Sequence, residues 1–104
     1  MNLYLMDKIK LNPEQLERAA NMLKAIAHPM RIAIIGYLEE GEALSVKELH
    51  EKLGIEQSTT SHHLGILKDK GVLVSRREGK KTFYSLRHDN LRTIIKCVSM
   101  CESP

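Results

Sequence analysis

Apolar positions near the start of the chain recur at helical spacing. The first stripe consists of Leu16, Ala19, Ala20, Leu23 and Ala27. Asn12 precedes this stripe as a helix N-cap, with Pro13 at the first helical position and Gln15 three residues after the cap. The pattern therefore predicts a long helix beginning at Asn12, after a short arm over residues 1–11 whose sequence indicates no definite structure.

A second helix is predicted from Pro29 to Gly41, and its apolar residues surround most of its girth. They are Ile32, Ala33, Ile34, Ile35, Tyr37 and Leu38. A helix without a polar face is buried on all sides in a soluble domain. We therefore expect this segment to be the central helix of the fold.

Residues 45–70 have the pattern of a helix-turn-helix. Ser45 and Glu48 have the spacing of a capping box, and Gly54 ends the first of its two helices. In the second helix, an inward stripe at i, i+4 and i+7 is formed by Thr60, Leu64 and Leu67. The first helix has wet positions at Lys47, His50, Glu51 and Lys52.

The other face of the second helix carries only small or polar residues, namely Ser58, Ser61, His62 and Gly65. Hydroxyl and imidazole groups reach base edges and phosphates, and glycine permits a close backbone approach, so the face suits the major groove of DNA. We predict that Gln57, Ser58, Ser61 and His62 contact DNA. The alternative is an exposed helix that is merely solvated.

Residues 72–86 contain two β-rich runs separated by a turn with Gly79, which predicts a hairpin. Its tip carries four cations, Arg76, Arg77, Lys80 and Lys81. Beside a recognition helix, such a hairpin is a wing that contacts phosphates or the minor groove. A charged tip on its own is usually only solvated.

A last helix is predicted over residues 89–102, with Asp89 as N-cap. Its apolar stripe has heptad-like spacing and comprises Leu91, Ile94, Ile95, Val98 and Cys101. One small domain has little surface left to cover a terminal stripe, so we expect a partner helix. The fold class is therefore mainly α with a β-hairpin: four helices, the hairpin and a fifth helix in a single domain over residues 1–104.

Composition narrows the function. The chain has a net charge of +3, and its cations concentrate between residues 68 and 92, which favours a polyanion partner over a membrane. No run of 18 apolar residues and no signal peptide is present, so we expect a cytoplasmic protein with reduced cysteines. Neither a phosphate-binding glycine loop nor a nucleophile elbow occurs, which argues against an enzyme.

Cys97 and Cys101 stand at i and i+4 on the last helix, where their sulfurs share one face. Two such thiolates suit a thiophilic metal or metalloid ion, such as trivalent arsenic, or a reaction with oxidants. The alternative is that both are apolar filler in a helix interface, with no cofactor at all. The five histidines lack metal-ligand spacing, and we expect His28 and His63 to serve in capping or packing.

Several segments in their order and spacing resemble the ArsR/SmtB family of bacterial winged-helix repressors. These are 25–32, 44–49, Ser-His-His-Leu at 61–64, Gly-Val-Leu at 71–73 and Tyr-Ser-Leu at 84–86. The resemblance covers nearly the whole chain from about residue 15. It implies a homodimeric, ligand-responsive transcriptional repressor that binds double-stranded DNA. In this family the first and last helices pack across a two-fold axis. The interface residues it implies are Leu16, Leu91, Ile94, Ile95 and Val98.

The chain departs from the sensor sites of this family. Its arsenic, cadmium and lead sensors carry Cys-x-Cys where this chain has residues 44–47 without a thiol. Alignment on Tyr84 puts His88, Asn90, Cys101 and Pro104 at the zinc positions of other members, and proline has no ligating side chain. Three hypotheses remain: a repressor released from an inverted-repeat operator by a thiol-reactive or metal inducer, a DNA binder without inducer, or a winged-helix module for protein contacts.

Overall fold

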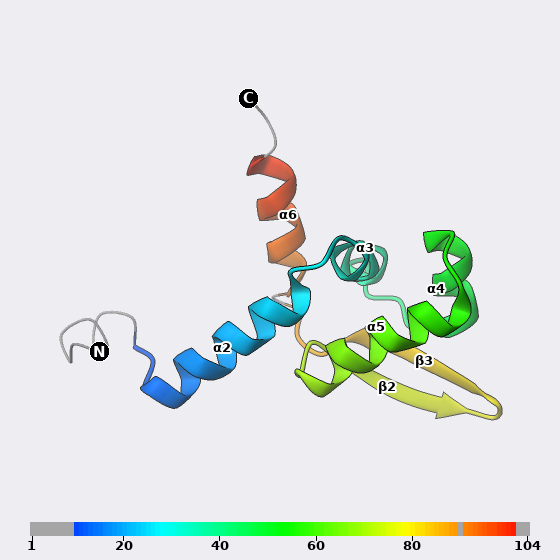
Figure 1. The fold of residues 1–104 in the computed structure, drawn as a ribbon, viewed down its shortest axis with the longest axis horizontal. Helices are drawn as coiled ribbons and strands as arrows, with labels where there is room; N and C mark the ends of the chain where they lie inside the picture. Colours follow the sequence, from blue (N-terminus) through cyan, green and yellow to red (C-terminus); the bar gives the residue numbers. More distant parts are fainter. Residues whose placement is uncertain (1–9, 90, 102–104) are drawn as a thin grey trace.

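The computed structural model describes residues 10–89 and 91–101. In these ranges the chain forms five helices and three strands (Figure 1). In order they are α2 (Pro13–Ile26), α3 (Pro29–Leu38), β1 (Leu44–Ser45), α4 (Val46–Leu53), α5 (Gln57–Asp69), β2 (Leu73–Glu78), β3 (Lys81–Leu86) and α6 (Leu91–Cys101). The arrangement is the predicted winged helix-turn-helix.

The helix starts follow the predicted capping chemistry. Asn12 Oδ1 accepts from the Gln15 amide at 2.8 Å, while Gln15 Oε1 accepts from the Asn12 amide at 2.9 Å. Ser45 and Glu48 form the same reciprocal pair at the start of α4, with both bonds at 3.1 Å. Each box satisfies amide groups that the first helical turn leaves without a carbonyl partner. Gly54 ends α4 in the left-handed conformation, at φ 69°.

The core gathers around α3, as its apolar girth predicts. Ile34, Ile35 and Leu38 are fully buried on this helix. Residues from α4, α5 and the start of β2 complete the cluster, including Leu49, Leu64, Leu67, Val72 and Leu73. Because α3 contacts both α4 and α5, it fixes the helix-turn-helix against the rest of the domain.

The sheet has one strand more than the sequence predicted. The hairpin pairs β2 with β3 in antiparallel register from Leu73↔Leu86 to Glu78↔Lys81. On its other side β3 pairs with β1, with Leu44 opposite Tyr84 and Ser45 opposite Phe83, so the strand order is β1-β3-β2. A two-residue strand is too short to show the alternation by which strands are recognised. It ties the start of α4 to the wing.

Helices α2 and α6 extend away from the body of the domain (Figure 1). Much of the predicted stripe on α2 is uncovered: Leu16 is half-buried and Leu23 is 57% exposed, while Ala25 and Ile26 at its end are buried. No described helix is long and apolar enough to cross a membrane.

One expected interface residue has a different place. Leu91 is only 5% exposed and belongs to the core cluster of the single chain, so a partner could cover little of it. Its position at the very start of α6, beside α3, accounts for this burial. The side chains of Ile94, Ile95, Val98 and Cys101 lie outside the described part of the structure, as does the arm up to residue 9.

Candidate nucleic-acid interface

The outer face of α5 is polar and exposed, except at the half-buried Gly65. Gln57, Ser58, Ser61 and His62 are all exposed, whereas Thr60, Leu64 and Leu67 on the inner face are fully buried. The predicted division of this helix into two faces is confirmed. The contact of the outer face with DNA stays a prediction.

The start of α5 has free hydrogen-bonding capacity. Its N-cap, Glu56, makes no side-chain hydrogen bond to the helix. Its carbonyl instead accepts from the Thr60 amide and the Thr60 hydroxyl, both at 3.0 Å. The first turn of the helix therefore has no side-chain cap from Glu56, and the helix dipole favours an anion at this end.

The wing holds its cations along the hairpin. Arg76 Nε lies 2.9 Å from Glu78 Oε1 in an exposed ion pair, and its guanidinium lies 5.9 Å from the centre of the Phe83 ring. Arg77 Nε donates to the Gly79 carbonyl at 3.3 Å. An exposed ion pair contributes little stability, so phosphates can compete for Arg76.

A cleft of about 190 Å³ lies between the helix-turn-helix and the wing. Its lining comprises Ser45, Val46, Lys47, Gln57, Lys80, Lys81 and Thr82. Three of these are lysines, and the pairing of β1 with β3 brings the first of them, Lys47, beside the wing. The sequence pattern placed Lys47 only on a wet face. Its proximity to the wing depends on the third strand, which left no signal in the sequence.

Glu48 is the acidic group at the edge of this region. Hydrogen bonds from the backbone and then the side chain of Ser45 hold the pKa of Glu48 below its ordinary value, and the charges of Lys81 and Lys52 act in the same direction. The carboxylate is occupied by its capping bond to the Ser45 amide. Its single negative charge offsets only part of the charge of the three lysines that line the cleft.

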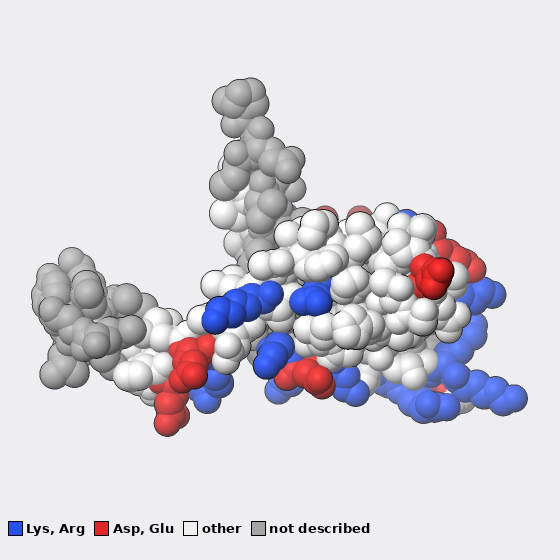
Figure 2. Space-filling model, in the orientation of Figure 1, with Lys and Arg blue, Asp and Glu red and all other residues white. Residues whose placement is uncertain are grey.

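Lysine and arginine side chains gather along the lower right edge of the molecule in Figure 2, where Figure 1 places the wing. The residues exposed there include Arg76, Arg77, Lys80 and Lys81, so the structure brings together the four predicted wing cations. Gln57 joins two of them at the cleft. A positive edge next to a polar helix face matches the shape and charge of a DNA groove with its flanking phosphates.

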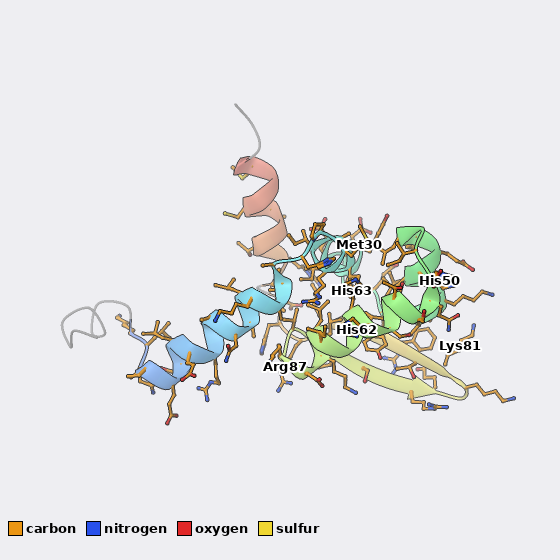
Figure 3. All side chains as sticks on the ribbon, in the orientation of Figure 1. Met30, His50, His62, His63, Lys81 and Arg87 are labelled. Atoms are coloured by element: carbon orange, nitrogen blue, oxygen red, sulfur yellow. The ribbon has the colours of Figure 1, made fainter. Side chains whose placement is uncertain are left out.

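The histidines have structural surroundings. His28 caps α3, with Nδ1 accepting from the Met30 amide at 3.1 Å, as expected. His63 is buried and also packs as expected, and Figure 3 shows it between α5 and the start of α3. His50 differs from its predicted wet position: it is half-buried, and its Nδ1 lies 3.2 Å from the Ile55 carbonyl in the turn.

The thiols are only partly described. Cys97 is an exposed free cysteine on α6, and the Cys101 side chain lies outside the described residues. Among the described residues, no group of three histidine, cysteine, aspartate or glutamate side chains could hold a metal ion. The sensing role of Cys97 and Cys101 stays a prediction.

Comparison with known proteins places these features in a group of regulators. Residues 26–76 match a family described as a helix-turn-helix domain. The chain is 37% identical over 90 residues to the transcriptional repressor PagR of Bacillus anthracis, covering 86% of this chain and 90% of that protein. The crystal structure of PagR aligns with a TM-score of 0.75, covering 84% of this chain and 99% of PagR.

Two further relatives are similar. The HTH-type transcriptional repressor SmtB of Mycobacterium tuberculosis is 39% identical over 82 residues, covering 79% of this chain and 60% of that protein. The homodimeric winged helix-turn-helix domain Mb0332 of Mycobacterium bovis, described as a possible ArsR-family regulator, aligns with a TM-score of 0.73 at 26% identity, covering 83% of this chain and 79% of that domain.

Proposed function

The chain belongs to the ArsR/SmtB family of winged helix-turn-helix transcriptional regulators, and from this we propose that it represses transcription as a homodimer on an inverted-repeat operator. Its relatives are DNA-binding regulators, so the chain is not an enzyme. The observation that carries the proposal is the exposed polar face of α5 beside the lysine-lined cleft.

In the proposed complex, α5 enters the major groove. Ser61 and His62 lie on its exposed face and contact base edges, which carry the sequence information. The cleft holds a backbone phosphate between Lys47, Lys80 and Lys81. This division assigns recognition to the helix and most of the sequence-independent affinity to the cleft and the wing.

Two observations support the proposed dimer: the stripe of α2 is uncovered, and the chain is similar to Mb0332, which is homodimeric. A dimer with two-fold symmetry presents two copies of α5 in opposite directions. The matching DNA site is an inverted repeat whose half-sites lie about one helical turn apart, or a multiple of it.

Affinity titrations with operator and random duplex DNA test the proposal. Ser61→Ala and His62→Ala should reduce the preference for operator, whereas Lys80→Ala and Lys47→Ala should weaken binding to both DNAs and flatten its salt dependence. Each lost phosphate contact lowers the slope of log affinity against log salt by about one unit per protomer. Lys24→Ala, in an exposed position on α2, is the control for a general change of charge.

A winged-helix module for protein contacts is the competing hypothesis. It predicts no binding to duplex DNA even at low salt, or a complex that salt does not weaken. If the helix variants and the cleft variants lost the same affinity for both DNAs, the division of roles would be contradicted. The proposal that the protein binds DNA would still stand.

We further propose that a thiol-reactive or metalloid inducer acts through Cys97 and Cys101. The exposure of the Cys97 thiol supports access by such a compound. Loosening DNA a hundredfold requires an inducer preference of about 3 kcal/mol for the released dimer shape. Replacing both cysteines by serine should preserve operator affinity and abolish release by arsenite, persulfide or oxidant; an intact response would show that the thiols only pack.

A further inference from the structure

Arg31 and His63 lie behind the exposed face of α5 and have no part in the contacts assigned so far. We propose that they are positioning residues: Arg31 holds α5 in its DNA-reading orientation through a neutral His63, and protonation of this imidazole by mild acid weakens operator binding. The inference rests on the proposed function, because it concerns the same helix.

One guanidinium connects three helices at this point. Arg31 belongs to α3, and its Nε donates to Nδ1 of His63 on α5 at 3.2 Å. Its Nη1 donates to the carbonyl of Ala25, in the last turn of α2, at 3.1 Å. α5 is thereby tied through a side chain to the end of the helix whose outer stripe lies uncovered.

His63 is well enclosed for this role. Only 6% of its surface is exposed, and its ring centre lies 4.6 Å from that of His28, the N-cap of α3. Figure 3 shows His63 next to the start of α3, where Met30 is labelled. Rings packed at this distance have little freedom to turn away, so a change of charge must be absorbed by moving a helix.

The hydrogen bond fixes the protonation state that the site accepts. Nδ1 of His63 accepts from Arg31, so the proton of the neutral ring is on Nε2. Adding a second proton at Nδ1 would set one N–H group against another, and it would put a cation beside the guanidinium. The bond between α3 and α5 is then lost and replaced by repulsion.

All charged groups that act on His63 are basic. The pKa of His63 is lowered from its ordinary value of 6.5, and burial of the ring is the largest cause. Next come the charges of His28, of Arg31 and of His62, the residue before His63 in the chain. In the described residues, neither α5 nor the elements packed against it, α2, α3, α4 and β2, contribute an acidic side chain to this set. No carboxylate is placed to stabilise an imidazolium here, so the site favours the neutral ring.

The direction of the effect follows. The pKa of His63 in the folded protein lies below 6.5. The stability that its neutral ring contributes is therefore complete above pH 6.5 and is lost as the pH falls through the lower folded value. His62 has the opposite influence, because it is exposed on the DNA face and its protonation adds a positive charge toward the phosphates. The two consecutive histidines therefore change DNA affinity in opposite directions.

A His62→Gln protein isolates the buried residue. We expect its operator affinity to fall roughly tenfold as the pH is lowered from about 7.5 through the lowered pKa of His63, since each dimer carries two copies of this residue. Adding His63→Gln, whose amide oxygen still accepts from Arg31 but cannot take up a proton, should remove most of that fall. An equal fall in both proteins would overturn the inference.

A measurement on the wild-type protein guards against misfolded variants. NMR titration of the His63 ring, free and bound to operator, should show the imidazole protonating at lower pH in the complex, because linkage requires the DNA-bound form to disfavour the proton. The phosphates alone would shift it upward, so an upward shift on binding overturns the inference. Failure of the wild type to bind duplex DNA at neutral pH would instead refute the proposed function, and the inference with it.

Discussion

Gly54 and Gly65 belong to the same helix-turn-helix but differ in backbone conformation. Gly54 ends α4 at φ 69°, in the region that residues with a side chain rarely adopt. Gly65 lies within α5, with helical geometry and no positive φ. A Cβ added at either position would meet no atom within 4 Å, so backbone conformation alone decides the effect of a substitution.

Alanine should therefore act in opposite directions at these two sites. Gly54→Ala is expected to lower the free energy of unfolding by about 1 kcal/mol, and Gly65→Ala to raise it by about 0.5–1 kcal/mol. Urea denaturation of both variants gives the comparison. The same sign in both would contradict it. If α5 lies as close to DNA as proposed, Gly65→Ala should also weaken operator binding despite its greater stability.

The roles of two adjacent histidines show what could be predicted at the scale of single residues. Helical periodicity separates the exposed His62 from the buried His63, and the sequence alone predicted that separation. It did not predict the Arg31 partner, because the two residues are 32 positions apart and meet only once α3 packs on α5. Long-range contacts of this kind leave no periodic signal.

At the scale of elements, Ser45 is shared by two of them. It ends β1, pairing with Phe83, and it caps α4 through its hydroxyl and amide. The capping box was predictable from the spacing of Ser45 and Glu48, but the strand was not. A strand of two residues that runs directly into a helix has neither a periodicity nor a turn of its own.

Ser45→Ala should remove the hydrogen bond that the Ser45 hydroxyl accepts from the Glu48 amide, while the β1 backbone pairing is kept. We expect a loss of about 1 kcal/mol in the free energy of unfolding, the usual cost of a lost N-cap, whereas Ser58→Ala on the exposed first turn of α5 should change it little. Thermal unfolding of the two variants makes the comparison. Equal stability would show that the cap contributes nothing.

The same variant has a pH signature. The Ser45 bonds lower the pKa of Glu48 from 4.5, so the stability that they confer is present above 4.5 and is lost as the pH falls through the lower folded value. Ser45→Ala removes the side-chain contribution to that shift. Unfolding measured across this acid range should therefore depend less steeply on pH in the variant than in wild type.

At the scale of the whole molecule, the stripe of α2 is an open apolar surface among the described residues. Leu23→Glu should leave the fold of the protomer intact, because the side chain is 57% exposed, but it should place charges in the proposed dimer interface. We expect sedimentation at micromolar concentration to shift toward the monomer. Asn21→Glu, an exposed change of equal charge on the same helix, is the matched control and should stay dimeric. A monomeric wild type would contradict the dimer.

Helical spacing predicted the apolar stripe of α2, and the family resemblance implied that the first and last helices form an interface. Neither could say which residues of a stripe are covered by the partner and which by the chain itself. Leu91 satisfies the same heptad-like spacing as its neighbours in α6 but is buried within its own chain. Spacing identifies the face of a helix. Whether a given turn of the helix is covered by its own chain or by a partner depends on where the helix leaves the domain, which is a property of the tertiary fold.

The sheet order β1-β3-β2 leaves one side of β2 without a strand partner in the described residues. An open strand edge can template association with a second edge, and charged side chains along it oppose that association. We therefore expect Arg76 and Arg77 on β2 to oppose aggregation as well, apart from any contact with phosphate. A variant with both arginines replaced should aggregate more readily even without DNA. Selection against aggregation would therefore preserve both arginines in a descendant that no longer bound an operator.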